Sequence, residues 1–160
     1  MENKMFCYQC QETANCSGCT VSGVCGKKPD VAAMQDLLVY ATKGLSAVAE
    51  EARAEGKEVS PDLNHRVTMN LFITITNANF DKDAIVDHIK ETFAMRDAVR
   101  ATLSDSSKLP KAATVEVAEK DYEIFAQSIG VLSTENEDIR SLRELITYGL
   151  KGLAAYSKHA

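Results

Sequence analysis

Residues 29–56 read PDVAAMQDLLVYATKGLSAVAEEARAEG, and this stretch decides the fold class. Its apolar residues recur at spacings of three and four, which places them on one face of a helix. They are Val31, Met34, Leu37, Leu38, Ala41, Leu45, Val48 and Ala52. Pro29 suits a first helical turn because its φ is fixed near the helical value, and Gly56 suits the end of a helix. The sequence therefore predicts a helix from about residue 30 to residue 55.

Two further helices are expected before residue 104. Pro61 can restart a helix, and we keep residues 72–76 helical although they are rich in β-branched residues, because no partner strand with hairpin chemistry lies nearby. Residues 77–80 are turn-like, and Asp81 can cap a third helix that runs to about Leu103. The first three helices are thus expected to form one bundle.

The remainder of the chain begins with an exposed connection, residues 104–114, which contains several serines and Pro110. A short helix is expected from about 118 to 129. Thr134 and Glu137 have the spacing of a capping box, and an apolar stripe follows them along a last helix. The stripe consists of Ile139, Leu142, Leu145, Ile146, Leu150, Leu153 and Ala154. We therefore predict an all-α protein with a cysteine-rich iron–sulfur loop (1–28), a first helical bundle (29–103), and a linker with the start of a second helical bundle (104–160).

Composition and charge exclude several classes of function. The chain has 160 residues, 45% of them apolar and 26% charged, as soluble globular proteins do. Its net charge of -5 argues against a nucleic-acid-binding protein, which needs a clustered basic surface. Its longest apolar runs are far shorter than the roughly 20 residues that span a bilayer, and its first residues lack the apolar core of a signal peptide. We expect no membrane role and a cytoplasmic location.

The five cysteines all lie within the first 25 residues, and they carry the chemistry. They are Cys7, Cys10, Cys16, Cys19 and Cys25. Reducing cytosol keeps thiols reduced, and an odd number of cysteines suits disulfides poorly, so the cluster indicates metal or redox chemistry. Gly18, Gly23 and Gly26 allow the loop to turn and to present backbone N–H groups to sulfur.

The spacing of the cysteines leaves two ligand sets open. Cys7, Cys10, Cys16 and Cys19 form a pair of C-x2-C elements, which suits tetrahedral zinc or a single iron. Cys7, Cys10, Cys19 and Cys25 form a longer set, which surrounds a four-iron cluster more easily. Spacing alone does not choose between iron–sulfur and zinc.

The residues around the cysteines resemble those of the hybrid cluster proteins, also called prismane proteins or hydroxylamine reductases. The segments that carry the resemblance are MFCYQCQET (5–13), GCT (18–20), GVCGK (23–27), QDLL (35–38), TITNANFD (74–81), STENED (133–138), SLREL (141–145) and YGLKGLAAY (148–156). They extend over the whole chain. The resemblance implies that Cys7, Cys10, Cys19 and Cys25 hold a cluster, with Cys16 as a spare thiol that departs from the family pattern. It also implies a [4Fe-4S] cluster, because the family members with longer gaps bind [2Fe-2S].

The resemblance further implies that this chain is the amino-terminal part of a longer enzyme. In the family, catalysis occurs at a second, hybrid iron–sulfur–oxygen cluster held by later domains, and residues 26–160 contain no cysteine that could ligate it. We therefore expect no catalytic residue and no activity in this segment alone. The implied role is to take electrons from a protein electron donor and pass them to the remaining domains of the parent enzyme. The complete enzyme would reduce hydroxylamine to ammonia and water, and possibly also nitric oxide.

Two alternatives remain beside this interpretation. One is a stand-alone ferredoxin-like electron carrier, and the other is a structural zinc-binding module. A cluster would also be lost easily from an aerobic sample. Lys27 and Lys28 offer a small positive edge for an acidic electron donor, although two surface lysines are commonplace.

Overall fold

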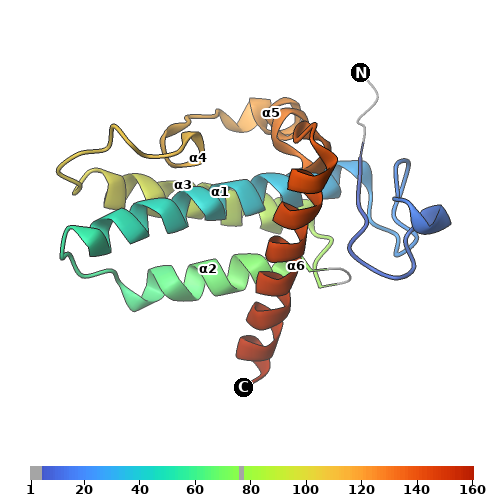
Figure 1. The fold of residues 1–160 in the computed structure, drawn as a ribbon, viewed down its shortest axis with the longest axis horizontal. Coiled ribbons are helices and arrows are strands. Elements are labelled where there is room, and N and C mark those ends of the chain that lie inside the picture. Colours follow the sequence, from blue (N-terminus) through green and yellow to red (C-terminus); the bar gives the residue numbers. More distant parts are fainter. Residues whose placement is uncertain (1–4, 76–77) are drawn as a thin grey trace.

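The computed structural model describes residues 5–75 and 78–160. Its helices are η1 (Ala14–Cys16), α1 (Pro29–Ala54), α2 (Pro61–Ile73), α3 (Lys82–Arg100), α4 (Lys111–Thr114), η2 (Glu119–Asp121), α5 (Tyr122–Ile129), η3 (Val131–Ser133) and α6 (Glu137–His159), where η marks a 3-10 helix. The described residues form no β-strand, only an isolated bridge. The prediction of an all-α protein is confirmed. Helices α1, α2 and α3 run alongside one another, and α6 crosses their end (Figure 1).

Helix α1 has the boundaries that its sequence predicts. Pro29 occupies the first turn, and Lys28 precedes it as the N-cap. The helix ends at Ala54, and Gly56 follows with a φ of +74°, a conformation that costs glycine little. Because α1 packs against α2, α3, α4 and α5, it is the central helix of the fold.

Side-chain caps fix the starts of α2 and α3. Ser60 accepts a hydrogen bond from the backbone N–H of Asp62, and Asp81 accepts one from that of Ala84, at 3.2 and 3.1 Å. The predicted cap at Asp81 is confirmed. Helix α2 ends at Ile73, so it stops inside the segment 72–76 that is predicted to be helical. Residue 76 of that segment, and residue 77 of the predicted turn, lie outside the described residues.

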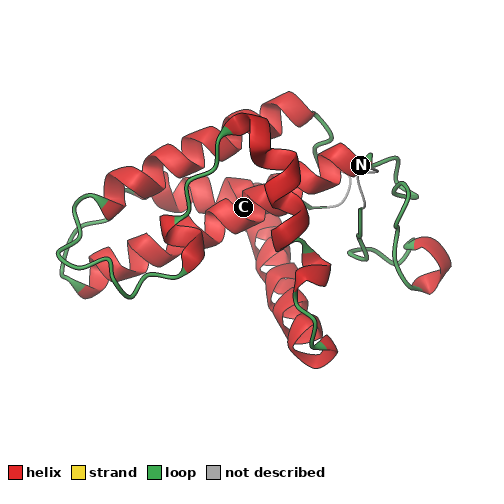
Figure 2. Ribbon diagram, turned by 90° about the horizontal axis from the view of Figure 1, so that it is seen from above, coloured by secondary structure: helices red, strands yellow, loops and turns green. Residues whose placement is uncertain are grey.

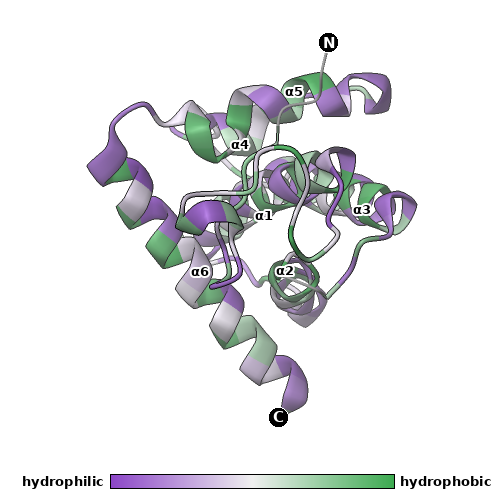
Figure 3. Cartoon of the chain, turned by 90° about the vertical axis from the view of Figure 1, so that its right-hand side faces the viewer, coloured by the Kyte–Doolittle hydropathy of each residue, from purple (hydrophilic) through white to green (hydrophobic). Residues whose placement is uncertain are grey.

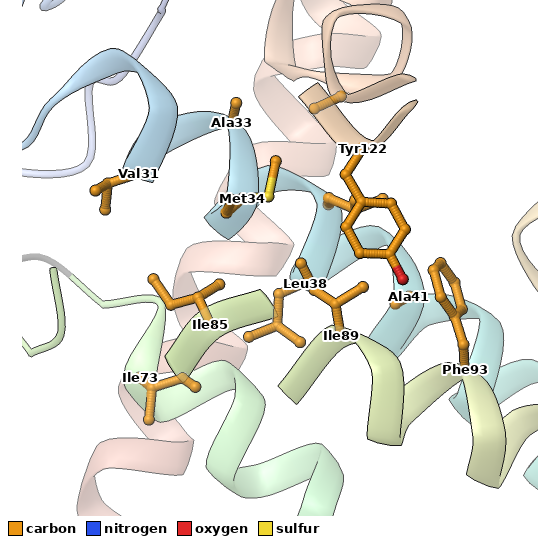
Figure 4. Packing of buried hydrophobic residues seen from close by; sticks show 12 residues of the cluster. Val31, Ala33, Met34, Leu38, Ala41, Ile73, Ile85, Ile89, Phe93 and Tyr122 are labelled. Carbon is orange, nitrogen blue, oxygen red and sulfur yellow. The ribbon is translucent and has the colours of Figure 1, made fainter. Parts of the chain in front are cut away.

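The main core lies at the end of the bundle nearer the cysteine loop. Its buried side chains come from α1, α2, α3 and α5, and Figure 4 shows them converging from these helices. They are Val31, Ala33, Met34, Leu37, Leu38, Ala41, Ile73, Ile85, Ile89, Phe93, Tyr122 and Ala126. A second cluster, built from Leu45, Val48, Ala49, Leu63 and Ala113, fills the other end. Burial of these side chains from water is the main force that holds the helices together.

The segment 104–114, expected to be an exposed connection, is partly buried. It contains α4, whose Ala112 and Ala113 are buried against α1. The buried Arg96 of α3 donates a hydrogen bond to the carbonyl of Ala112 at 3.1 Å. The expectation failed because a four-residue helix is too short to show apolar periodicity, whereas its backbone carbonyl can still be held by an arginine that is distant in the sequence. The predicted division at residue 104 stays a prediction.

Helix α6 differs from its prediction in two ways. Its N-cap is Asn136, which accepts from the N–H of Ile139 at 3.0 Å, so the capping box of Thr134 and Glu137 does not form. Thr134 instead accepts a hydrogen bond from Arg143. The buried face consists of Thr147, Lys151 and Ala154, while most of the predicted apolar stripe is exposed. Its exposed members are Ile139, Leu142, Leu145, Ile146, Leu150 and Leu153, and Figure 3 shows hydrophobic positions spread along this helix.

None of the helices in the described ranges has the length and apolar character needed to cross a membrane.

Candidate functional site: a loop of free thiols

The cysteines lie on a loop that projects from one end of the bundle, beside the first turn of α1 (Figure 2). Within the described residues 5–28 this loop has one turn of 3-10 helix, η1, and otherwise irregular backbone. A small cluster of Met5, Cys19 and Ala32, with Cys7 and Ala14 against it, anchors the loop to α1. The loop is therefore packed against the first turns of α1 at Cys7 and Cys19.

Cys7 and Cys19 are joined through their backbones. The N–H of Cys7 donates to the carbonyl of Cys19 at 3.1 Å, and the N–H of Cys19 donates to the carbonyl of Cys7 at 2.8 Å. These two bonds form an isolated antiparallel bridge across the loop. The hydroxyl of Thr13 adds a third bond to the carbonyl of Cys7, at 3.1 Å. The bridge brings together two cysteines that are 12 positions apart in the sequence.

The sulfur of Cys19 is surrounded by hydrogen-bond donors. Its side chain is only 4% exposed, and the N–H of Ala14 lies 3.5 Å from Sγ. The backbone N–H groups of Ala14 and Val24 lower the pKa of the Cys19 thiol, with smaller help from Thr13 and Lys27, against the opposing effect of burial. Donors directed at sulfur favour the thiolate, which is the form that ligates metals.

Cys10 and Cys25 lie on turns of the same loop, and both are half-buried. The N–H of Thr13 donates to the carbonyl of Cys10 at 3.2 Å. Near Cys25 the chain turns tightly, because a Cβ on Gly23 would lie 3.0 Å from the Cys25 sulfur. Gly26 then has a φ of +91°, a conformation in which most residues would be strained. Both glycines therefore serve the local turn that presents Cys25.

Cys16 differs from the other four cysteines. It is exposed at the end of η1, and its φ of +56° lies in the left-handed region. Asn15 before it has a φ of +54°. Such conformations are uncommon for residues other than glycine, so the outer end of η1 is a strained turn.

The chemistry of this donor set fits an iron–sulfur cluster. All five cysteines are free thiols, and soft thiolates with N–H groups directed at sulfur are the environment that such clusters use. Within the described ranges, no three side chains of histidine, cysteine, aspartate or glutamate approach closely enough to hold one metal ion together. Backbone bonds bring Cys7 and Cys19 together. Cys10 and Cys25 lie on neighbouring turns of the same loop, and the described structure does not gather them with Cys7 and Cys19 around one metal ion.

Two lysines near the loop were not identified as buried from the sequence. Lys27 is 2% exposed, and its Nζ lies 3.8 Å from the sulfur of Cys7. The expected positive surface edge is therefore wrong for Lys27, whereas Lys28 is exposed. Lys151 of α6 is also 2% exposed and donates to the carbonyl of Thr74 at 3.1 Å. The sequence offers no signal for the burial of either lysine, because lysine side chains are usually exposed.

Residues 5–160 match the Prismane/CO dehydrogenase family. Among curated proteins, the chain is 53% identical to "Hydroxylamine reductase" of Desulfovibrio desulfuricans, over 100% of this chain and 30% of that protein. It is 53% identical to "Hydroxylamine reductase" of Clostridium perfringens and 49% identical to "Hydroxylamine reductase 2" of Clostridium acetobutylicum, each over 98% of this chain and 30% and 32% of the relative. The chain thus spans about a third of the length of these relatives, at their amino-terminal end.

Proposed function

This chain belongs to the Prismane/CO dehydrogenase family, and from that membership we propose that it is the amino-terminal, electron-transfer part of a hydroxylamine reductase. The observation that carries the proposal is the loop of free thiols, in which N–H groups of Ala14 and Val24 act on the buried sulfur of Cys19. A loop that exists only to pack would have no reason to direct donors at sulfur. Electron transfer is favoured because the loop projects from the bundle, where a partner protein can reach it (Figure 1).

In this proposal Cys7, Cys10, Cys19 and Cys25 hold a [4Fe-4S] cluster, and the exposed Cys16 is left out. When bound, such a cluster supplies one-electron redox chemistry at a potential set by its surroundings. The residues of this chain supply the ligands of the cluster and the groups that surround them. The four thiolates fix the position of the group, the bridge between Cys7 and Cys19 keeps two of them at a set separation, and the N–H of Ala14 stabilises negative charge on Cys19.

The reaction of the complete enzyme would be the two-electron reduction of hydroxylamine, in which two protons are taken up and ammonia and water are formed. Nitric oxide is a second candidate substrate. The hybrid cluster that carries out this chemistry would be held by residues outside 1–160, since residues 26–160 contain no cysteine. The present chain would deliver electrons to that centre, in the cytoplasm, where thiol ligands stay reduced.

The partners in this proposal are the remaining domains of the enzyme and a protein electron donor. The outer face of α6 supports the first partner, because its apolar residues are exposed and nothing in the described structure lies within 4 Å of a Cβ placed on Gly149 or Gly152. The tip of the cysteine loop supports the second. Val21 and Val24 are 81% and 61% exposed in the segment before Cys25, and they would give a donor an apolar contact near the cluster.

The test is anaerobic reconstitution of the chain with iron and sulfide. We expect four irons and four sulfides per chain and an electron paramagnetic resonance signal after reduction. Cys25→Ser is expected to lose the cluster, whereas the matched variant Cys16→Ser is expected to keep it. The opposite behaviour of these two variants would show that the ligand set is wrong. One zinc per chain without acid-labile sulfide would contradict the electron-transfer role altogether.

A further inference from the structure

Lys27 is a buried cation directed at a proposed ligand. Its Nζ lies 3.8 Å from the sulfur of Cys7, and its side chain is 2% exposed. The backbone holds it there, because the N–H of Gly23 donates to the Lys27 carbonyl at 2.8 Å. Burying an ammonium group is costly unless a negative partner compensates. Among the described residues, the Cys7 sulfur is the side-chain atom to which Lys27 donates.

Lys151 is a second buried cation, which approaches from the bundle side. Its Nζ donates to the carbonyl of Thr74, the residue after α2, at 3.1 Å. Burial lowers the pKa of Lys151 to about 8; the negative charges of Asp36 and Cys7 act to raise this pKa, and the positive charge of Lys27 acts to lower it. Lys151 also lines a pocket with Tyr8 and Gln9 of the cysteine loop, so it approaches the loop beside Cys7 although α6 is far from it in the sequence.

Asp36 of α1 is the counter-charge of this group. It lines a cavity of about 40 Å³ together with Gln9 of the cysteine loop and Glu144 and Lys151 of α6. The cavity is large enough for water, and the Gln9 side-chain oxygen in this part of the loop has no hydrogen-bond partner. Burial raises the pKa of Asp36 to about 7, against the attraction of Lys151 and Lys27. This cavity thus joins charged groups of α1 and α6 to Gln9, which lies two positions after Cys7 in the loop.

We propose that Lys27 and Lys151 form a buried cationic pair that raises the reduction potential of the cluster ligated by Cys7, and that Asp36 opposes them. This inference rests on the proposed function, since it needs a cluster on the cysteine loop. Reduction adds one negative charge to the cluster, and a fixed positive charge in a low-dielectric interior stabilises that charge. Lys27 also donates to the Cys7 sulfur, which acts in the same direction. Both lysines are positioning residues, because they act on the redox centre through charge.

The experiment is a redox titration of the reconstituted chain, followed by electron paramagnetic resonance. Lys27→Met and Lys151→Met remove one buried positive charge each, and Asp36→Asn removes the opposing negative charge. Lys28→Met is the matched control, because Lys28 is adjacent in sequence, carries the same charge and is exposed to screening solvent. We expect each buried-lysine variant to lower the potential by a change in the reduction equilibrium of about tenfold, or about 59 mV for one electron. Asp36→Asn should raise it.

The outcomes separate this inference from the proposed function. Potentials of Lys27→Met and Lys151→Met equal to that of Lys28→Met would overturn it, and so would a shift of Asp36→Asn in the same direction as the lysine variants. If Lys27→Met binds no cluster, the opposite signs expected for Lys151→Met and Asp36→Asn decide the matter. A wild-type chain without iron and sulfide contradicts the proposed function and this inference together. A loaded chain whose lysine variants keep the wild-type potential overturns this inference alone.

Discussion

Gly44 of α1 lies directly against the backbone carbonyl of Ala112 in α4: a Cβ built on Gly44 would be 2.1 Å from that oxygen. The contact is with the main chain, which cannot move aside as a flexible side chain can. The same carbonyl accepts a hydrogen bond from the buried Arg96, so a shift of α4 would also break that bond. The absence of a side chain at residue 44 is what allows α4 to pack on α1.

We therefore expect Gly44→Ala to destabilise the fold by about 1–3 kcal/mol, the usual cost of overpacking a core. Chemical denaturation monitored by circular dichroism measures this free energy. The matched control is Gly149→Ala on α6, where no atom of the described residues, apart from the neighbouring backbone of the helix itself, lies within 4 Å of the added methyl group. That variant should gain up to about 1 kcal/mol in this chain from the higher helix propensity of alanine. Equal effects of the two substitutions would contradict the packing described for α4.

Glu55 gives the fold a defined dependence on pH. Its carboxylate accepts from Lys57 and from the N–H and hydroxyl of Ser104, which together lower the pKa of Glu55 to about 2. A carboxyl whose pKa is lowered by folding stabilises the folded state above its unfolded pKa, and this contribution is lost as pH falls through the folded value. The relevant window runs from pH 4.5 down to about 2.

The advantage of the wild-type chain over Glu55→Gln should accordingly be full at pH 6 and should disappear as the pH approaches 2. Urea denaturation at several pH values measures the difference. Lys57→Met should shrink the same pH-dependent part, because the hydrogen bond from Lys57 is the largest cause of the lowered pKa. A difference between wild type and Glu55→Gln that stays constant from pH 6 to pH 2.5 would rule out this role for Glu55.

The exposed face of α6 should make the 160-residue chain associate with itself. Leu145 and Leu153 are 67% and 66% exposed, within a helix that also exposes Ile139, Leu142, Ile146 and Leu150. Apolar patches of this kind drive association when no partner covers them. Sedimentation velocity should show that Leu145→Glu with Leu153→Glu reduces association, while far-UV circular dichroism stays unchanged. A wild-type chain that remains monomeric at high concentration would contradict this expectation.

The chain alone should not turn over hydroxylamine. If its one cluster is ligated by four thiolates, no iron has a free position for substrate, and residues 26–160 offer no cysteine for a second centre. The assay follows ammonia formation with a chemical reductant, with a full-length hydroxylamine reductase as the positive control. Sustained ammonia formation by the reconstituted chain would refute the assignment of catalysis to other domains.

Much of the fold follows from local chemistry that is visible in the sequence. The ends of α1 at Pro29 and Gly56, and the cap of α3 at Asp81, depend only on neighbouring residues, and the structure has them as predicted. The exposed face of α6 does not follow in this way. Apolar periodicity shows which residues favour burial, yet six members of the stripe are exposed. The curated relatives of this chain are about three times longer than it is. Periodicity alone therefore does not show which face of α6 the described structure covers.

The candidate site was predictable as a loop but not in its surroundings. Clustered cysteines and turn glycines indicate the loop directly, whereas the burial of Lys27 and Lys151 depends on contacts across the fold. Lys151 meets Thr74, which is 77 positions away, and Lys27 meets Cys7, 20 positions away. Lysine is usually exposed, so neither residue stands out when the sequence is taken alone.

The bridge between Cys7 and Cys19 has a consequence for the order of assembly. Its two backbone bonds close the segment 8–18 into a loop without the help of any sulfur. Closing a loop restricts the chain and has an entropic cost, which here arises when the polypeptide folds rather than when iron arrives. If the proposed cluster is inserted into this loop, two of its thiolates are already placed, and only the turns that carry Cys10 and Cys25 have to adjust.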